Sequence, residues 1–141
     1  MRHQKRTVKL NRNAPHRRCM IANMLKSLVE HERIETTVPN AKELRRHADR
    51  LITLAKKNTL ASRRAALAKM MISFNPLSSK ERRDVKKGNT SSYNTDRKVM
   101  GKLFDELSAR FVSREGGYTR IIRKENRQGD GCALCLIEYV Q

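Results

Sequence analysis

Apolar residues recur with two different spacings along this chain of 141 residues, and the spacings separate helical from strand-like segments. Beyond a polar start, apolar positions at alternating intervals of one and three residues run from Met20 to Val29. This pattern predicts one buried face of a helix. Asn13 is placed to cap that helix, and Pro15 is tolerated in its first turn. The helix is expected to end near His31.

A dense run of β-branched residues follows at 33–38 and predicts a short strand that Pro39 ends. Asn40 and Glu43 have the spacing of a capping box, which predicts a helix over 41–57. The face that this second helix is expected to bury consists of Leu44, Ala48, Leu51, Ile52 and Ala55.

The remaining pattern predicts two more helices, over 59–71 and 95–112, and then two strands. The strands are expected over 118–127 and 132–140, joined by the turn sequence QGDG at 128–131. The apolar faces of the two helices are expected to contain Leu60, Leu67, Ala68 and Met71 in one, and Val99, Met100, Leu103, Phe104, Leu107 and Phe111 in the other.

Two segments lack such a pattern. Residues 1–13 are polar and basic and are interpreted as an extended tail, which leaves 14–141 as one domain. Residues 73–94 are interpreted as a polar insertion, mobile in the free protein, in which Ser78 and Glu81 cap a short helix. The order of elements, with helices between a first strand and a final strand pair, predicts an α+β fold.

Charge changes the picture more than any single motif does. The net charge is +18, from 32 Lys and Arg against 14 Asp and Glu, and the first acidic residue is Glu30. Such a charge weakens the folded state unless a polyanion neutralises it, so nucleic acid is the leading partner and an anionic membrane surface the second. No stretch is long and apolar enough to span a membrane. The basic residues before Glu30 are Arg2, Lys5, Arg6, Lys9, Arg12, Arg17, Arg18 and Lys26.

No motif for catalysis or for a cofactor is present, and the four histidines are scattered, so the chain is not expected to be an enzyme or to hold a metal. Cys132 and Cys135 form a C-x-x-C within a strand-like segment, where they would point to opposite faces, so a structural role is expected. Only 4% of residues are aromatic, too few for a base-stacking platform. Phosphate and sugar contacts by Arg and Lys remain, which suits recognition of a folded nucleic acid by its shape.

Several segments together resemble one family. LNRN at 10–13, TTVPNAKELRR at 36–46, LITLAK at 51–56 and GGYTRI at 116–121 are similar to the bacterial large-subunit ribosomal protein seventeen family. The resemblance covers nearly the whole chain except residues 73–94. Because it begins at Met1, it argues against a mitochondrial presequence.

This resemblance implies a two-layer domain of helix, strand, three helices and two strands, in which we expect a small mixed sheet. It also implies a structural protein of the cytoplasmic ribosome that binds large-subunit rRNA near the exit of the peptide tunnel, beside other ribosomal proteins. No membrane, cofactor or small-molecule substrate is expected. The alternative is a DNA-binding architectural protein of the nucleoid type, with an RNA-modifying enzyme as a third choice.

Candidate RNA-binding residues fall on four parts of the chain. The start of the first predicted helix carries cations where the helix dipole favours anions, and RNA phosphates near Asn13 to Arg17 would explain them. Tyr118 could stack on a base or ribose, or lie in the core. The candidates are Arg2, His3, Lys5, Arg6, Lys9 and Arg12 in the tail, extended in an RNA groove and ordered on binding; Asn11, Asn13, His16, Arg17 and Arg18 at the helix start; Arg45, Arg46 and Arg50 on the second helix; and Tyr118, Thr119, Arg120, Arg123, Lys124 and Arg127 on the hairpin.

Overall fold

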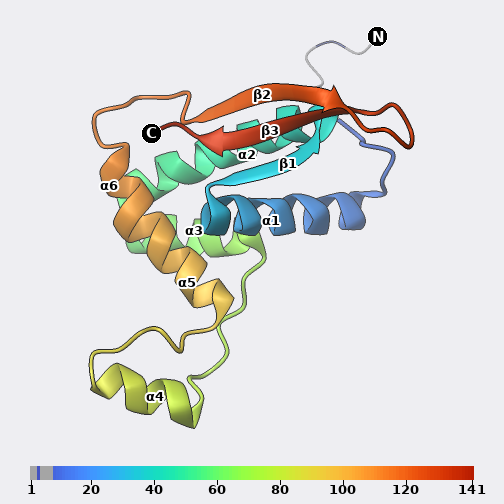
Figure 1. Ribbon diagram of the computed structural model, residues 1–141. Helices are drawn as coiled ribbons and strands as arrows, with labels where there is room; N and C mark the ends of the chain where they lie inside the picture. The colour runs from blue at the N-terminus through green and yellow to red at the C-terminus, as the bar shows by residue number, and fades with distance from the viewer. Residues whose placement is uncertain (1–2, 4–7) are drawn as a thin grey trace.

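The computed structural model describes residue 3 and residues 8–141 and consists of two layers, a sheet and a set of helices that covers one of its faces (Figure 1). The predicted α+β class and the order of elements are confirmed. The elements are α1 (Ala14–His31), β1 (Arg33–Thr37), α2 (Val38–Lys57), α3 (Leu60–Met70), α4 (Ser79–Lys86), α5 (Thr95–Gly101), the π-helical η1 (Lys102–Leu107), α6 (Ser108–Arg110), β2 (Thr119–Asn126) and β3 (Ala133–Tyr139).

The sheet has three strands in the order β1-β3-β2, and both pairings are antiparallel. Ile137 in the central strand lies opposite Ile34 of β1 on one side and Ile121 of β2 on the other. The prediction of a mixed sheet is therefore wrong. A short turn between β2 and β3 allows only antiparallel pairing, and β1 runs antiparallel to β3 at its other edge, so no strand has a parallel neighbour.

The core lies between the sheet and helices α1 and α2. Asn13 caps α1 as predicted, because its side-chain oxygen accepts a hydrogen bond from the His16 backbone N–H at 3.1 Å. Cys135, Ile137 and Tyr139 alternate along β3 and face the helices, as expected for a strand with one buried face. The predicted buried face of α2 is confirmed in full, since Leu44, Ala48, Leu51, Ile52 and Ala55 have no exposed surface.

The start of α2 differs from the prediction. The strand ends at Thr37, and the helix begins at Val38 without any side-chain cap. Pro39 lies in the first turn, where its missing N–H is no loss, so this proline starts the helix instead of only ending the strand. The predicted capping box is wrong because the Glu43 carboxylate binds side chains one turn further along, not the backbone of Asn40.

The predicted buried face of α3 is also partly wrong. Leu60, the first residue of the helix, is 66% exposed, and Met71, in the left-handed conformation just after the helix, is 47% exposed. The buried positions are Ala66 and Met70, while Leu67 packs at the edge of the core. Thr59 and Ser62 form a capping box at the start of α3.

The helix predicted over 95–112 runs to Arg110 and contains the π-helical segment η1, which periodicity did not predict. At the end of η1 the Ser108 N–H bonds to the Leu103 carbonyl, five residues back, and the Ser108 hydroxyl donates to the Phe104 carbonyl. The apolar face remains in the core.

Candidate nucleic-acid interface

The junction between the tail and α1 is held by one arginine. The Arg17 guanidinium donates to the backbone carbonyls of Arg12 at 3.2 Å and Lys9 at 3.5 Å, so it fixes the backbone before the helix. The first turn of α1 contains no acidic residue. The structure therefore brings together five predicted candidates, Lys9, Arg12, Asn13, His16 and Arg17, around the positive end of a helix.

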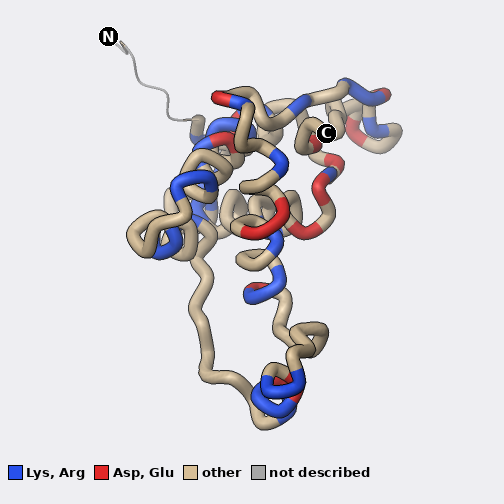
Figure 2. Tube along the Cα trace, turned by 90° about the vertical axis from the view of Figure 1, so that its left-hand side faces the viewer, with Lys and Arg blue, Asp and Glu red and all other residues tan. Residues whose placement is uncertain are grey.

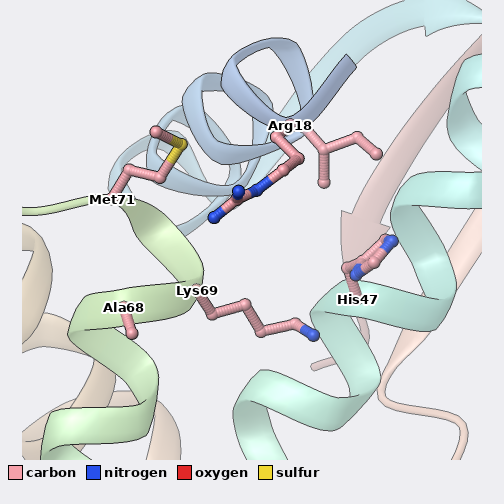
Figure 3. Close-up of a pocket in the computed structure, with 6 residues that line it drawn as sticks. Arg18, His47, Ala68, Lys69 and Met71 are labelled. Carbon is pink, nitrogen blue, oxygen red and sulfur yellow. The ribbon is translucent and has the colours of Figure 1, made fainter. Parts of the chain in front are cut away.

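A groove between α1, α2 and α3 collects basic side chains from all three helices. Arg18 comes from α1, His47 from α2 and Lys69 from α3, and all three border a hollow of about 180 Å³ (Figure 3). Ile21 and Met71 add apolar lining. A neighbouring hollow of about 310 Å³ shares Arg18, Ile21 and His47 and extends along the junction as far as Val8 and Arg17. We call the two hollows together the interhelix groove.

The electrostatics of the interhelix groove favour an anion. Partial burial lowers the pKa of Lys69, and the nearby Arg50 guanidinium lowers that pKa further. Burial also lowers the pKa of His47, and Lys69 adds to the effect, although Glu43 opposes it. Arg50 thus makes Lys69 harder to protonate, and Lys69 does the same to His47, a repulsion that a bound phosphate would relieve.

One carboxylate borders the interhelix groove, and it is already engaged. Glu43 accepts a hydrogen bond from Arg46 at 3.0 Å and lies 3.3 Å from the His47 ring nitrogen. Arg45 and Arg50, on the same helix, are exposed and have no carboxylate within ion-pair distance among the described residues. The predicted basic face of α2 thus contains one paired arginine and two without a pair.

Most cations of the β2–β3 hairpin are paired, in contrast. Arg120 binds Glu138, Lys124 binds Glu35, and Arg127 lies 3.1 Å from Asp130. Glu138 also accepts from Arg33 of β1 at 3.0 Å and is 5% exposed, so two arginines cover it. Of the predicted hairpin cations, Arg123 is exposed and has no ion pair within the described chain.

Two predicted site residues do not reach the surface. Tyr118 is 2% exposed and packs against Phe111, with ring centroids 5.2 Å apart, so of its two possible roles the structure shows the core role. Thr119 is 8% exposed because its hydroxyl donates to the Asp49 carboxylate of α2 at 3.0 Å. Thr119 thus joins β2 to α2, and burial removes both residues from the predicted binding surface.

The remaining predictions concern the tail, the cysteines, a metal site and a membrane span. Arg2, Lys5 and Arg6 fall outside the described residues, while His3 and Asn11 are exposed. Cys135 is buried in β3 with its thiol 3.4 Å from the Thr36 carbonyl oxygen, but Cys132 precedes the strand. No set of three metal-binding side chains gathers among the described residues, nor does a helix in that part of the chain have the length and apolarity to cross a membrane.

Neither Lys69 nor His47 was among the RNA-binding residues predicted from the sequence. Lys69 lies in the last turn of α3, where a cation also suits the helix dipole, so the sequence offers an ordinary explanation for it. Only the packing of α3 against α1 and α2 brings Lys69 near Arg18.

The fold and the surface are those of a small, strongly basic α+β protein with cations gathered between its helices. Within that class the chain belongs to the ribosomal protein L17 family, whose sequence profile matches residues 20–140. It is 64% identical to the large ribosomal subunit protein bL17 of Protochlamydia amoebophila over 140 residues, which cover 99% of each chain. The proteins of the same name from Chlamydia abortus and Chlamydia pneumoniae are 61% and 58% identical over the same shares.

This membership confirms the predicted family and the prediction of a ribosomal protein that is not an enzyme. Residues 73–94 lie within the length that these relatives match. The polar insertion predicted at 73–94, which the resemblance did not cover, is therefore not peculiar to this chain.

Proposed function

We propose that this protein is a structural constituent of the large ribosomal subunit that binds and stabilises folded large-subunit rRNA through phosphate and sugar contacts. The observation that carries the proposal is the interhelix groove, where Arg18, His47 and Lys69 meet and the one neighbouring carboxylate is engaged by Arg46 and His47. The relatives are named as large ribosomal subunit proteins, and these names are the basis for proposing the large subunit.

The aromatic side chains favour backbone contacts over base contacts. Phe104, Phe111, Tyr118 and Tyr139 are each at most 3% exposed. The other two aromatics, Phe74 and Tyr93, lie against Arg97. Sequence-specific RNA binding needs aromatic faces on which bases can stack, so phosphate and 2′-hydroxyl contacts are the mode that this surface offers.

The start of α1 extends the interhelix groove into a continuous anion-binding region. The N–H groups of the first turn and the positive end of the helix dipole point out of the same end of α1 that bears His16 and Arg17. Arg17 also holds the backbone of Lys9 and Arg12 there. We therefore place a backbone phosphate between Asn13 and Arg17, with the tail continuing along the RNA.

Sedimentation tests the proposal directly. A tagged protein in a cell lysate is expected to sediment with the large subunit at physiological salt and to leave it as salt is raised, because phosphate contacts release counterions. Protein that runs free of the subunit at physiological salt would contradict the proposal. Purified protein that prefers duplex DNA to large-subunit rRNA would support the architectural alternative instead.

The tail is tested by deletion. Removal of residues 2–12 is expected to leave the circular dichroism spectrum of the domain intact, since the described core begins within α1, but to weaken incorporation into subunits. Loss of folding would refute the assignment of these residues as a binding tail. We also propose that the protein lies near the exit of the peptide tunnel, and crosslinking from Arg12 to rRNA next to that exit would test this location.

A further inference from the structure

Residues 73–94, which we call the arm, stand apart from the two layers. In Figure 1, α4 lies below the body, and extended segments join it to the ends of α3 and α5. No residue of α4 is buried. Isolated helices of fewer than about 12 residues are marginal in water, so an exposed helix of eight residues needs another source of stability.

Local polar contacts supply part of that stability. Ser78 and Glu81 form the predicted capping box: the Glu81 N–H donates to the Ser78 hydroxyl oxygen at 3.2 Å, and the Ser78 N–H donates to the Glu81 carboxylate at 2.7 Å. The second oxygen of Glu81 accepts from the backbone N–H of Asn94 at 3.2 Å, and Asn94 in turn caps α5. One carboxylate therefore connects the beginning of α4 to the end of the arm.

The base of the arm is held by Arg97. Its guanidinium lies 4.9 Å from the ring centre of Phe74 on the outgoing segment and 5.8 Å from that of Tyr93 on the returning segment. It also donates to the backbone carbonyl of Asn75. Because Arg97 contacts both segments, it holds the two ends of the arm together beside the start of α5.

The exposed face of α4 is basic. Ser79, Arg82, Arg83 and Lys86 are spaced three, four and seven residues from the first, so they share one face, and they border an open hollow of about 410 Å³. Figure 2 shows Lys and Arg gathered on this helix. Hydrogen bonds to the carbonyls of Leu77 and Ser79 orient the two guanidinium groups. None of the three cations has an ion pair within the described chain.

Three neighbouring cations without carboxylate partners repel one another until a polyanion neutralises them. Guanidinium groups match phosphate oxygens in pairs. A protein partner would need an apolar centre to the interface, and Val85 is the one apolar residue of α4. We propose that this face of α4 is a second RNA-binding surface, which holds backbone phosphates of folded large-subunit rRNA at a place separate from the interhelix groove; the proposal rests on the proposed function.

Two matched triple variants of the full-length protein test this surface. The arm variant carries R82Q, R83Q and K86Q, and the groove variant carries R18Q, R50Q and K69Q, so each loses three positive charges. Arg18 and Lys69 border the interhelix groove, and Arg50 lies near Lys69. The probe is a transcript of large-subunit rRNA, bound at a series of salt concentrations. The arm variant is expected to bind about tenfold more weakly than wild type, with a salt slope that is smaller by about 2 to 3. Its helix content by circular dichroism should be unchanged, because none of the substituted residues is buried.

The outcomes distinguish the two proposals. If both variants lose affinity and slope, both surfaces bind rRNA. If the groove variant alone is affected, the arm proposal is overturned and the proposed function stands. If neither is affected, both are overturned. An additional variant with R82K and R83K keeps the positive charge of this face. It is expected to retain the salt slope of wild type. A smaller slope in this variant would show that the charge of this face is not what binds rRNA, and would also overturn the proposal.

Discussion

The interhelix groove and the β2–β3 hairpin are both rich in Lys and Arg, but their cations have different partners. On the hairpin, Arg120, Lys124 and Arg127 each bind a carboxylate of this same chain. In the interhelix groove, Arg18 and Lys69 have no such partner in the described structure. Positive charge alone therefore does not mark an RNA-binding surface. The cations that remain without a carboxylate are the ones available to a phosphate.

The largest expected difference is in RNA affinity. The groove variant with R18Q, R50Q and K69Q is expected to bind large-subunit rRNA about tenfold more weakly than wild type, from three lost phosphate contacts. A hairpin variant with R120Q, K124Q and R127Q loses the same charge but is expected to weaken binding by about twofold or less, because those cations are already paired. Filter binding at one salt concentration compares the two. Equal losses would show that total charge, not pairing, determines binding.

The second expected effect is on stability. Glu32, between α1 and β1, binds Arg110 at 2.7 Å and Lys102 at 2.9 Å, and these contacts lower its pKa from 4.5 to about 2. Since the folded-state pKa lies below the unfolded one, the stabilisation is fully present above pH 4.5 and is lost as the pH falls through 2. E32Q is therefore expected to lower the free energy of unfolding by about 1–2 kcal/mol at pH 7, allowing for solvent screening.

Denaturant unfolding at several pH values checks this effect. The difference between wild type and E32Q should shrink from pH 5 to pH 2. A difference that does not change with pH would mean that the loss comes from packing and not from the charge. RNA affinity measured beside it should hardly change, because Arg110 and Lys102 lie outside the interhelix groove.

The sequence predicted the elements well because their signals are local. The periodicity of α1 and α2, the Asn13 cap, the Ser78–Glu81 capping box and the hairpin turn each depend on residues close in the chain. The errors arose where a residue had a choice of partners. Glu43 could cap α2 or bind Arg46 and His47, and Ser108 could point to solvent or take the carbonyl of Phe104.

The proposed binding surface was harder to predict than the fold, because its residues meet through contacts between distant parts of the chain. The partners of Arg120 and Lys124 lie 18 and 89 residues away along the chain, so the sequence shows the cation without its carboxylate. Tyr118 and Thr119 look exposed in a basic segment, yet the contacts with Phe111 and Asp49 bury them. Lys69 joins the site only through the packing of α3, a tertiary contact that no local pattern encodes.

A smaller effect would come from releasing paired cations. E138Q removes the carboxylate that holds Arg33 and Arg120 together. Both guanidinium groups then become available to phosphate, and the affinity for rRNA is expected to rise about two- to threefold, with a steeper salt dependence. E35Q releases Lys124 alone and should produce about half of that change in salt slope. Unchanged affinity in both variants would mean that the hairpin does not face the RNA at all.

The smallest expected effect concerns pH. Partial burial lowers the pKa of His47, and Lys69 and Arg46 oppose its protonation while Glu43 favours it, so the ring is neutral at pH 7. A phosphate in the interhelix groove favours the charged ring and raises that pKa, so binding takes up a proton and affinity increases as the pH falls. Between pH 7.5 and 5.5 wild type is expected to gain about twofold more affinity than H47N. H16N, at the start of α1, separates this effect from that of the other nearby histidine. Identical pH profiles for wild type and H47N would place the phosphate outside the interhelix groove. The difference in RNA binding between the interhelix groove and the hairpin would then depend on the arginines and lysines alone.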